Sequence, residues 1–362
     1  MEEVLTTNPD DQDTTGITSW LAKGTYSQNN PQKKLNYQAG FDFNIETGEG
    51  KRILDYYQQI GDYALFGSIK WNPGRHLSLQ PGIRLIYNTK YAAPVVYALS
   101  GKWLFNDNLS VRLSYSKGFR SPSIKELYLY FVDINHNVQG NPDLASETSN
   151  NINLNLLYGK ETRRYSWSAE LSAFYNHVND IITLAQVQGG DNLYTYINVD
   201  QYNSVSGQLG LLFKFLPSLT IQTAVAETGR NYKQDDQDTG SEFFFSTDVT
   251  ANAAYSFIKH DMTFALYYKY TGKTPQFQFD ETTISEAYVN PYNIMDFTFS
   301  KGFFENLLRV STGVKNIFDV TTVPAVGGTS GGGHGSGGNG MESIGWGRTF
   351  FLKLSINFNK IK

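Results

Sequence analysis

Apolar and polar residues alternate with a period of two along most of this chain. Leu109, Val111, Leu113 and Tyr115 alternate with serine and arginine, and residues 350–358 repeat the pattern. Such alternation is typical of strands with one apolar and one polar face. About fifteen segments match this template, and no long amphipathic helix is evident. They begin near Ile17, Leu35, Ile60, Leu77, Val95, Leu109, Asn151, Arg164, Ser204, Leu219, Ser246, Met262, Asn293, Leu307 and Trp346.

The connections between these segments alternate between short turns and long loops. Residues 72–76 and 216–218 are typical short turns, whereas 118–148 and 271–291 are long; residues 88–94 are short where a long loop is due. Outer-membrane β-barrels have short periplasmic turns at one rim and long loops at the other. The longest apolar stretches fall well below the ~18 residues of a membrane helix. The sequence therefore predicts an all-β fold, a transmembrane antiparallel β-barrel.

Composition removes several other classes of protein. Aromatic residues make up 15% and charged residues 18%, which is not the composition of a disordered chain. The absence of cysteine excludes a disulfide scaffold, a cysteine-ligated zinc site and a thiol enzyme. A net charge of −4 argues against a nucleic-acid partner. No serine-hydrolase, zinc-protease or P-loop motif occurs, so we expect no enzymatic activity and no catalytic residues.

Tryptophan positions and strand parity refine the prediction. Trp71, Trp103 and Trp167 fall near short-turn ends and Trp20 and Trp346 near long-loop ends, as in two aromatic girdles. With alternating direction, the first and last of fifteen strands both run toward the short turns. Single-chain bacterial barrels have even strand numbers, so fifteen strands do not close a regular barrel. A soluble β-rich protein is disfavoured, because every strand would expose an apolar face.

We therefore expect about 15 of the ~22 strands of a plugged transporter, that is, the C-terminal part of its barrel. Residues 1–16 are expected to form an outer loop or flexible start, and residues 17–362 the C-terminal portion of the barrel. The opening MEEVLTTNPDDQD has no basic start, apolar core or cleavage site, so it is not a secretory signal peptide.

Three segments resemble the TonB-dependent outer-membrane receptors. Residues 119–122 are similar to an FRAP box, with Ser121 in place of alanine, and residues 140–144, followed by Glu147, to a GNPDL box. GVKNIFDV at 313–320 resembles the penultimate strand of that family, and residues 347–358 resemble its closing strand. The motif residues are Phe119, Arg120, Pro122, Asn141, Pro142, Asp143, Asn316, Phe318 and Phe358. Both boxes are expected to be mainly architectural, because proline and Asn-Pro punctuate structure.

The resemblance implies a barrel plugged by an N-terminal domain, which is expected to be absent from these residues. It also implies energised uptake of a scarce nutrient complex across the bacterial outer membrane. Its expected partners are the TonB complex, acting through an N-terminal region that these residues do not include, outer-membrane lipid and a possible surface lipoprotein. The expected cargo is a ferric siderophore or haem, which would be transported and would not serve as a cofactor. A cobalamin receptor and a passive porin remain alternatives.

Candidate ligand contacts lie in the long loops. His136 lies between the two boxes and would be a metal ligand only if haem is the cargo. Tyr128, Tyr130 and Phe131 are expected to stack on a porphyrin or an aromatic siderophore. His334, within the glycine-rich segment 327–340, is a candidate second axial ligand. The alternatives to ligand binding are that His136 belongs only to a polar loop tip and that His334 belongs only to a mobile loop. The acidic runs at 10–13 and 235–238 lack the spacing of a calcium loop and are expected to be solvated.

Overall fold

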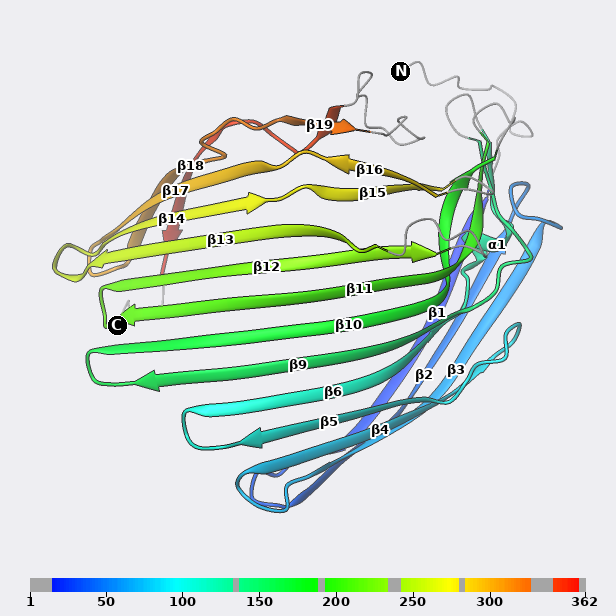
Figure 1. The fold of residues 1–362 in the computed structure, drawn as a ribbon, viewed down its shortest axis with the longest axis horizontal. Helices are drawn as coiled ribbons and strands as arrows, with labels where there is room; N and C mark the ends of the chain where they lie inside the picture. Colours follow the sequence, from blue (N-terminus) through cyan, green and yellow to red (C-terminus); the bar gives the residue numbers. More distant parts are fainter. Residues whose placement is uncertain are drawn as a thin grey trace.

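The computed structural model describes residues 15–132, 137–187, 193–233, 242–279, 284–326 and 341–357. Its main sheet has 17 strands; β7 and β8 are short loop strands, and the other fifteen form one curved wall (Figure 1). These are β1 (Gly16–Gln28), β2 (Leu35–Glu49), β3 (Tyr57–Trp71), β4 (Leu77–Asn88), β5 (Val96–Leu104), β6 (Leu109–Arg120), β9 (Glu147–Glu161), β10 (Tyr165–Gln186), β11 (Tyr194–Phe215), β12 (Leu219–Lys233), β13 (Phe244–Phe257), β14 (Met262–Thr271), β17 (Tyr292–Phe303), β18 (Leu308–Lys315) and β21 (Thr349–Ile356).

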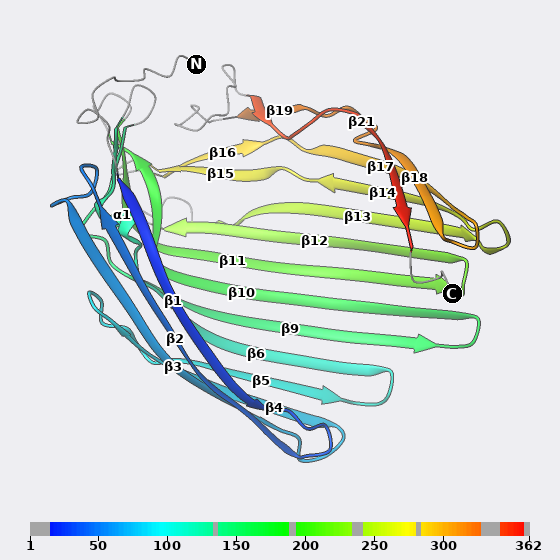
Figure 2. The ribbon, with the colours of Figure 1, turned by 180° about the vertical axis from the view of Figure 1, so that it is seen from behind.

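Each wall strand pairs antiparallel with the next wall strand along the chain, from β1 to β21. Seen from behind in Figure 2, the strands lie side by side across the wall. The predicted fifteen strands and their order are thereby confirmed. Among the described residues β1 pairs only with β2 and β21 only with β18, so the sheet is open along these two strands.

The alternation places polar and apolar side chains on opposite faces of the wall. On β2 and β3 one face carries Asp42, Asn44 and Asp62 and lines a cavity together with the loop after β6. The other face carries Phe41 and Phe43, whose ring centroids lie 5.0 Å apart. Large exposed hydrophobic side chains recur over the strands. Such a band of apolar side chains is what a barrel presents to lipid, while its interior is polar.

The two rims differ as the sequence predicts. Short turns such as 72–76 and 216–218 join the strands at one rim, and the longer connections lie at the other (Figure 1). Several predicted long loops are, however, largely ordered strand. β10 and β11 are 22 residues each, and residues 181–201 mostly belong to them. The predicted strands are too short there, because β10 and β11 continue beyond the residues in which apolar and polar side chains alternate.

The long-loop rim also carries the small elements. These are α1 (Ile124–Tyr128), β7 (Tyr130–Val132), β8 (Asn137–Gln139), β15 (Thr274–Phe279), β16 (Ile284–Val289), β19 (Thr322–Val326) and β20 (Met341–Ser343); the 3-10 helix η2 (Ile258–His260) lies at the opposite rim. β15, β16, β19 and β20 form a separate four-stranded sheet, which lies in the predicted loops 271–291 and 321–345. None of the helices in the described part of the chain has the length and apolar character needed to cross a membrane.

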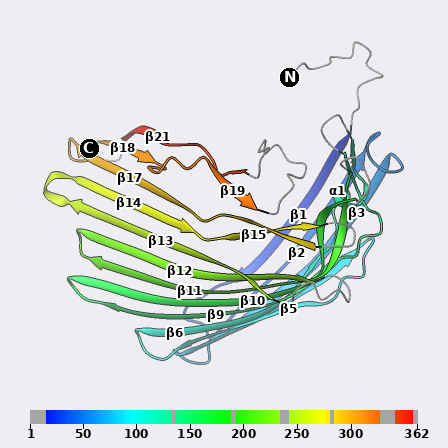
Figure 3. The same cartoon turned by 45° about the horizontal axis from the view of Figure 1, so that its top comes forward.

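A small hydrophobic core lies at the long-loop rim. Ile53, Ile60, Ile124, Leu127 and Leu144 are all nearly inaccessible to solvent and pack together. They come from the β2–β3 loop, β3, α1 and the segment before β9, so the core joins parts of the chain that are far apart in sequence. Figure 3 shows α1 beside β3 at this end of the wall. The core therefore fixes α1 at the rim where the long loops meet.

Candidate functional site

The segment between β6 and β9 begins with a capped helix. Ser123 is the N-cap of α1: its Oγ accepts from the backbone N–H of Glu126 at 3.3 Å, and its own N–H donates to Glu126 Oε2 at 2.8 Å. This reciprocal pair is a capping box, which satisfies helix-start N–H groups that would otherwise lack partners. Pro122 before it is buried and ends the pairing of β6, since proline has no N–H.

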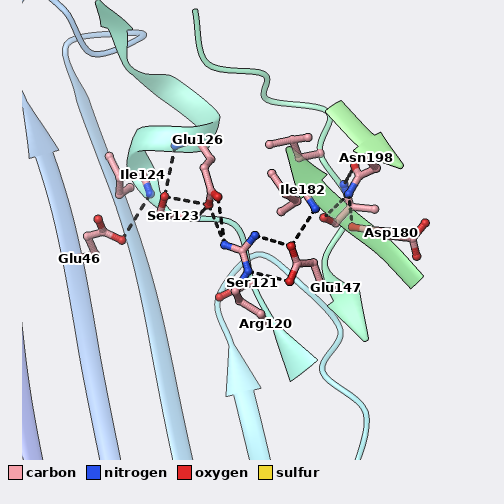
Figure 4. A network of polar contacts seen from close by, with 12 residues as sticks. Glu46, Arg120, Ser121, Ser123, Ile124, Glu126, Glu147, Asp180, Ile182 and Asn198 are labelled. Carbon is pink, nitrogen blue, oxygen red and sulfur yellow. Dashed lines mark hydrogen bonds and ion pairs between the residues drawn. The ribbon is translucent and has the colours of Figure 1, made fainter. Parts of the chain in front are cut away.

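Arg120 ties this helix to the adjacent strands (Figure 4). Its Nε donates to Glu147 Oε2 at 2.8 Å, and its Nη1 donates to Glu126 Oε2 at 3.0 Å. Glu147 Oε1 also accepts from the backbone N–H of Ile182 at 2.8 Å, which links β9 to β10. Burial by itself would raise the pKa of Glu126, but the Ser123 N–H and the Arg120 guanidinium outweigh it, so the pKa is lowered. The carboxylate is thus held ionised.

The second box, residues 140–144, also contacts α1 and a neighbouring strand. We call residues 120–144, together with the residues that they contact, the α1 junction. Asn141 Nδ2 donates to the carbonyl of Tyr196 at 2.9 Å, and Asn141 Oδ1 accepts from the N–H of Asp143 at 3.0 Å. The N–H of Asn141 also donates to the carbonyl of Glu126 at 2.9 Å. Lys90 Nζ donates to the carbonyl of Pro142 at 3.0 Å. The box residues therefore make turn and strand contacts that hold α1 against β11.

Backbone hydrogen bonds connect α1 and β7 to the β2–β3 loop. The N–H of Leu54 donates to the carbonyl of Tyr128 at 2.9 Å, and the N–H of Tyr130 donates to the carbonyl of Arg52 at 2.8 Å. Phe131 of β7 is the antiparallel partner of Val138 in β8. β8 in turn pairs in parallel with the start of β11. Residues of the β2–β3 loop, of the segment between β6 and β9 and of the start of β11 are thereby brought together.

Two cavities are lined in part by residues of this junction. One, here called the mouth pocket, has a volume of about 590 Å³ and is lined by Thr15, Ile17, Arg52, Lys125, Leu129, Phe131, Val138, Leu184 and Tyr196. The other, here called the wall pocket, has a volume of about 700 Å³; its lining includes Asp42, Glu46, Asp62, Arg84 and Phe119 to Ser123. The mouth pocket combines two cations with two aromatic rings. The wall pocket mixes carboxylates with basic groups.

The structure separates the predicted stacking residues. Phe131 lines the mouth pocket, where the guanidinium carbon of Arg52 lies 5.3 Å from its ring centroid. The Tyr128 hydroxyl accepts from Lys90 Nζ at 2.8 Å, and its ring packs against the small core instead. Tyr130 is half-buried in β7 and is not among the lining residues of either pocket. His136, His334 and Phe358 lie outside the described residues, as do both acidic runs.

Three lining residues escaped the sequence analysis: Arg52, Lys125 and Tyr196. Lys125 lies between the two boxes, in the same segment as Phe131. Its positive charge near that aromatic residue could have marked it as a candidate ligand contact. Arg52 lies in the β2–β3 loop and Tyr196 in β11, both far from α1 in sequence, and only the folded structure brings them to the pocket. Within the described ranges no three histidine or acidic side chains group into a site that could hold a metal ion.

The third motif forms a turn at the end of β18. Asn316 has a left-handed backbone with φ 51°, a conformation that asparagine tolerates better than most residues. Its Nδ2 donates to the carbonyl of Val320 at 2.8 Å, and its own N–H donates to Asp296 Oδ1 at 2.8 Å. Phe318 is half exposed beside it. This motif therefore shapes the turn that leads from β18 to β19 and ties it to β17, and none of its residues lines the mouth pocket.

The wall and its motifs define a β-barrel of the outer-membrane transport class. The family model "TonB dependent receptor-like, beta-barrel" matches residues 4–317. The chain thus belongs to the TonB-dependent receptor β-barrel family and is located in the bacterial outer membrane.

Curated and solved relatives agree with this family. An iron-regulated outer membrane virulence protein of Vibrio cholerae is 26% identical over 183 residues, which cover 47% of this chain and 28% of that protein. The siderophore receptor PirA of Pseudomonas aeruginosa superposes with a TM-score of 0.67 at 15% identity, over 94% of this chain and 55% of PirA. The iron transporter FrpB of Neisseria meningitidis gives 0.68 at 14%, over 94% and 55%. The chain spans about half the length of these structures.

Proposed function

We propose that this chain is the C-terminal barrel portion of a receptor that captures an iron complex at the outer face for energised uptake. The cargo is a ferric siderophore or haem. Family membership and the iron-related names of several similar proteins support this assignment. A copper transporter, OprC, superposes equally well, with a TM-score of 0.68, so the fold by itself does not select the ligand.

The mouth pocket is the observation that carries the proposal. It lies at the long-loop rim, which faces outward in this class of barrel. Its cations and aromatic rings belong to elements joined by backbone hydrogen bonds, so the backbone that carries these side chains is in place before any ligand arrives. Pre-formed pockets with a few placed polar groups are the usual form of small-molecule sites.

The proposed partners follow from the same assignment. The TonB complex would act through a region N-terminal to the wall. That region would also include a plug domain, which would fill the polar interior of the barrel. Outer-membrane lipid would cover the apolar face, including Trp20 and Trp346 near the long-loop rim and Trp71 and Trp103 near the other. A surface lipoprotein is a further proposed partner. The iron complex is cargo, so no resident cofactor is proposed.

A passive porin and a cobalamin receptor are the competing functions, and uptake measurements separate them. Accumulation of radio-iron, supplied as a ferric siderophore or as haem, would be compared in cells with the gene intact and deleted. We expect saturable accumulation that is lost on deletion and on collapse of the proton gradient. Accumulation that survives the uncoupler would indicate a porin. Uptake of cobalamin alone would move the assignment to that ligand.

Haem as cargo has a direct spectroscopic test. The detergent-solubilised protein would be titrated with hemin, beside a His136→Ala variant. A saturable red shift of the Soret band that the substitution weakens would identify haem as cargo and His136 as an axial ligand. Saturable iron-siderophore binding without such a shift would make His136 an ordinary loop residue.

A further inference from the structure

We propose that the lipid-facing side of the wall binds the phosphorylated head group of an outer-leaflet glycolipid, just above the apolar band. The site is a polar strip across the adjacent strands β6, β9, β10, β11 and β12 (Figure 1). We call it the outer strip, and its residues are Lys117, Thr148, Asn150, His177, Asn179, Gln201, Asn203, Asn231 and Lys233. The inference depends on the place of the barrel in the outer membrane and is independent of its cargo.

The register of the ladder places these residues in two neighbouring rows. Direct antiparallel pairing joins the first row, which is Lys117, Asn150, His177, Asn203 and Asn231. It also joins the second row, which is Thr148, Asn179, Gln201 and Lys233. His177 and Asn179 lie two and four residues after Tyr175, so they share its face of the sheet.

The apolar residues of β10 fix the depth of the strip in the membrane. Tyr165, Trp167, Leu171 and Tyr175 alternate along the lipid-facing side of this strand. Residues 165–175 match the ~9–11 residues with which a tilted strand crosses the hydrocarbon layer. His177 and Asn179 follow on the same face, so the strip begins where the head groups begin. Because the long-loop rim faces outward, these head groups belong to the outer leaflet.

Hydrogen bonds within the strip turn donors toward the membrane. The Tyr115 hydroxyl donates to Asn150 Oδ1 at 2.7 Å, which leaves the Nδ2 of Asn150 to donate elsewhere. The Tyr175 hydroxyl donates to Asn203 Oδ1 at 2.9 Å, and this oxygen also lies 2.7 Å from His177 Nδ1. An amide oxygen only accepts, so Nδ1 carries a proton and the opposite ring nitrogen, Nε2, is left for an outside group.

The charge of the strip is positive at its β6–β10 end. None of its residues is acidic, and Lys117, which is half-buried, makes no ion pair or hydrogen bond with the part of the chain that the structure describes. Two acidic residues, Glu227 and Glu242, belong to the β12 end, where Thr247 Oγ1 donates to Glu227 and Asn231 donates to the carbonyl of Glu242. The cationic part of the strip is therefore Lys117 and His177.

These groups match a sugar head group that carries phosphates. Ammonium and protonated imidazole groups bind phosphate oxygens through charge-assisted hydrogen bonds. The carboxamides of Asn150, Asn179 and Gln201 have both donors and acceptors for sugar hydroxyls. Neighbouring strands are ~4.8 Å apart, so the backbones of Lys117 and His177 lie about 10 Å apart across β9. A sugar frame with two phosphates contacts both cations and the carboxamides between them, which favours a glycolipid over a phospholipid.

The test measures lipid binding to the complete chain in dodecyl maltoside micelles. The probes are diphosphoryl lipid A, the same lipid with both phosphates removed, and phosphatidylglycerol. Native mass spectrometry over a range of lipid concentrations gives each apparent dissociation constant at low and high ionic strength. We expect diphosphoryl lipid A to bind at least about tenfold more tightly than its dephosphorylated form and several-fold more tightly than phosphatidylglycerol, and to weaken as ionic strength rises.

Variants assign the binding to the strip. Lys117→Gln and His177→Gln should each weaken binding of diphosphoryl lipid A by roughly fivefold, because each removes one partly screened charge-assisted contact. Lys117→Arg should retain the affinity, and Tyr115→Phe, which frees the Asn150 amide to rotate, should weaken it about twofold. The matched control is Lys160→Gln. Lys160 is exposed on the same face of β9 at the short-turn rim, paired with Trp167, and its loss should have no effect. Circular dichroism checks that each variant retains its β-structure.

Three results would overturn the inference. The first is equal affinity for lipid A with and without its phosphates, and the second is binding that Lys160→Gln weakens as much as Lys117→Gln does. The third is binding of phosphatidylglycerol as tight as that of diphosphoryl lipid A, which would make the strip a general site for anionic lipids. Each of these results would leave the proposed iron uptake standing, since radio-iron accumulation tests that function separately.

Discussion

Replacing Arg120 by glutamine should release the α1 junction from the barrel rim. The substitution removes the guanidinium that joins Glu126 on α1 to Glu147 on β9. It leaves two carboxylates whose side chains are only 17% and 15% exposed without their cation. The backbone path through β6 is unchanged, so the loss is confined to the contacts of one side chain.

The magnitude follows from the contacts and their exposure. A hydrogen bond to a charged group is worth ~1.5–3 kcal/mol, and Arg120 makes such bonds to two carboxylates. The Arg120 side chain is 44% exposed, so solvent screening reduces the sum considerably. We expect a net loss of about 3 kcal/mol, which corresponds to roughly a hundredfold rise in local opening. Arg120→Lys keeps the charge but not the bidentate geometry, so its effect should be smaller.

Hydrogen–deuterium exchange of the detergent-solubilised protein measures this opening directly. The reporting amides are those of Leu54 and Tyr130, which bond across the junction to Tyr128 and Arg52. Arg112→Gln is the matched control, because Arg112 is exposed on the same strand eight residues earlier. Equal exchange in the Arg120 and Arg112 variants would refute the view that the ion pairs hold the junction closed.

Two further perturbations probe the same junction. The pKa of Glu126 is lowered in the folded state, so its stabilising contribution is complete above its ordinary value and is lost as pH falls through the lowered one. Protection of α1 amides should therefore hold at neutral pH and decline below about pH 4, and Glu126→Gln should remove that dependence; an unchanged pH profile in this variant would contradict the assignment. In Gly140→Ala the new methyl would lie 2.6 Å from the backbone of Leu127, so the loop must shift. Trypsin should then cleave faster after Lys125, whereas Gly207→Ala, with open space around it, should behave as wild type.

Much of the architecture was accessible from the sequence. The fifteen wall strands, their order and the difference between the rims were predicted correctly, because each depends on short-range alternation and turn composition. The lengths of β10 and β11 were underestimated, because neighbouring apolar residues such as Ile181 and Ile182 break the apolar–polar alternation there. The segment between the boxes was recognised by resemblance, but its capped helix was not predicted: five residues are too few to show a helical period.

For the candidate site, too, some features follow from the sequence and others only from the tertiary structure. By itself the sequence determined which residues face lipid and which face the interior, because a strand's alternation is a local property of consecutive side chains. Only the tertiary structure decided that Arg52, Lys125, Phe131 and Tyr196 meet in one pocket while Tyr128 packs into the core. Those neighbours are set by the curvature of the wall and by hydrogen bonds between distant loops, and neither leaves a periodic trace in the chain.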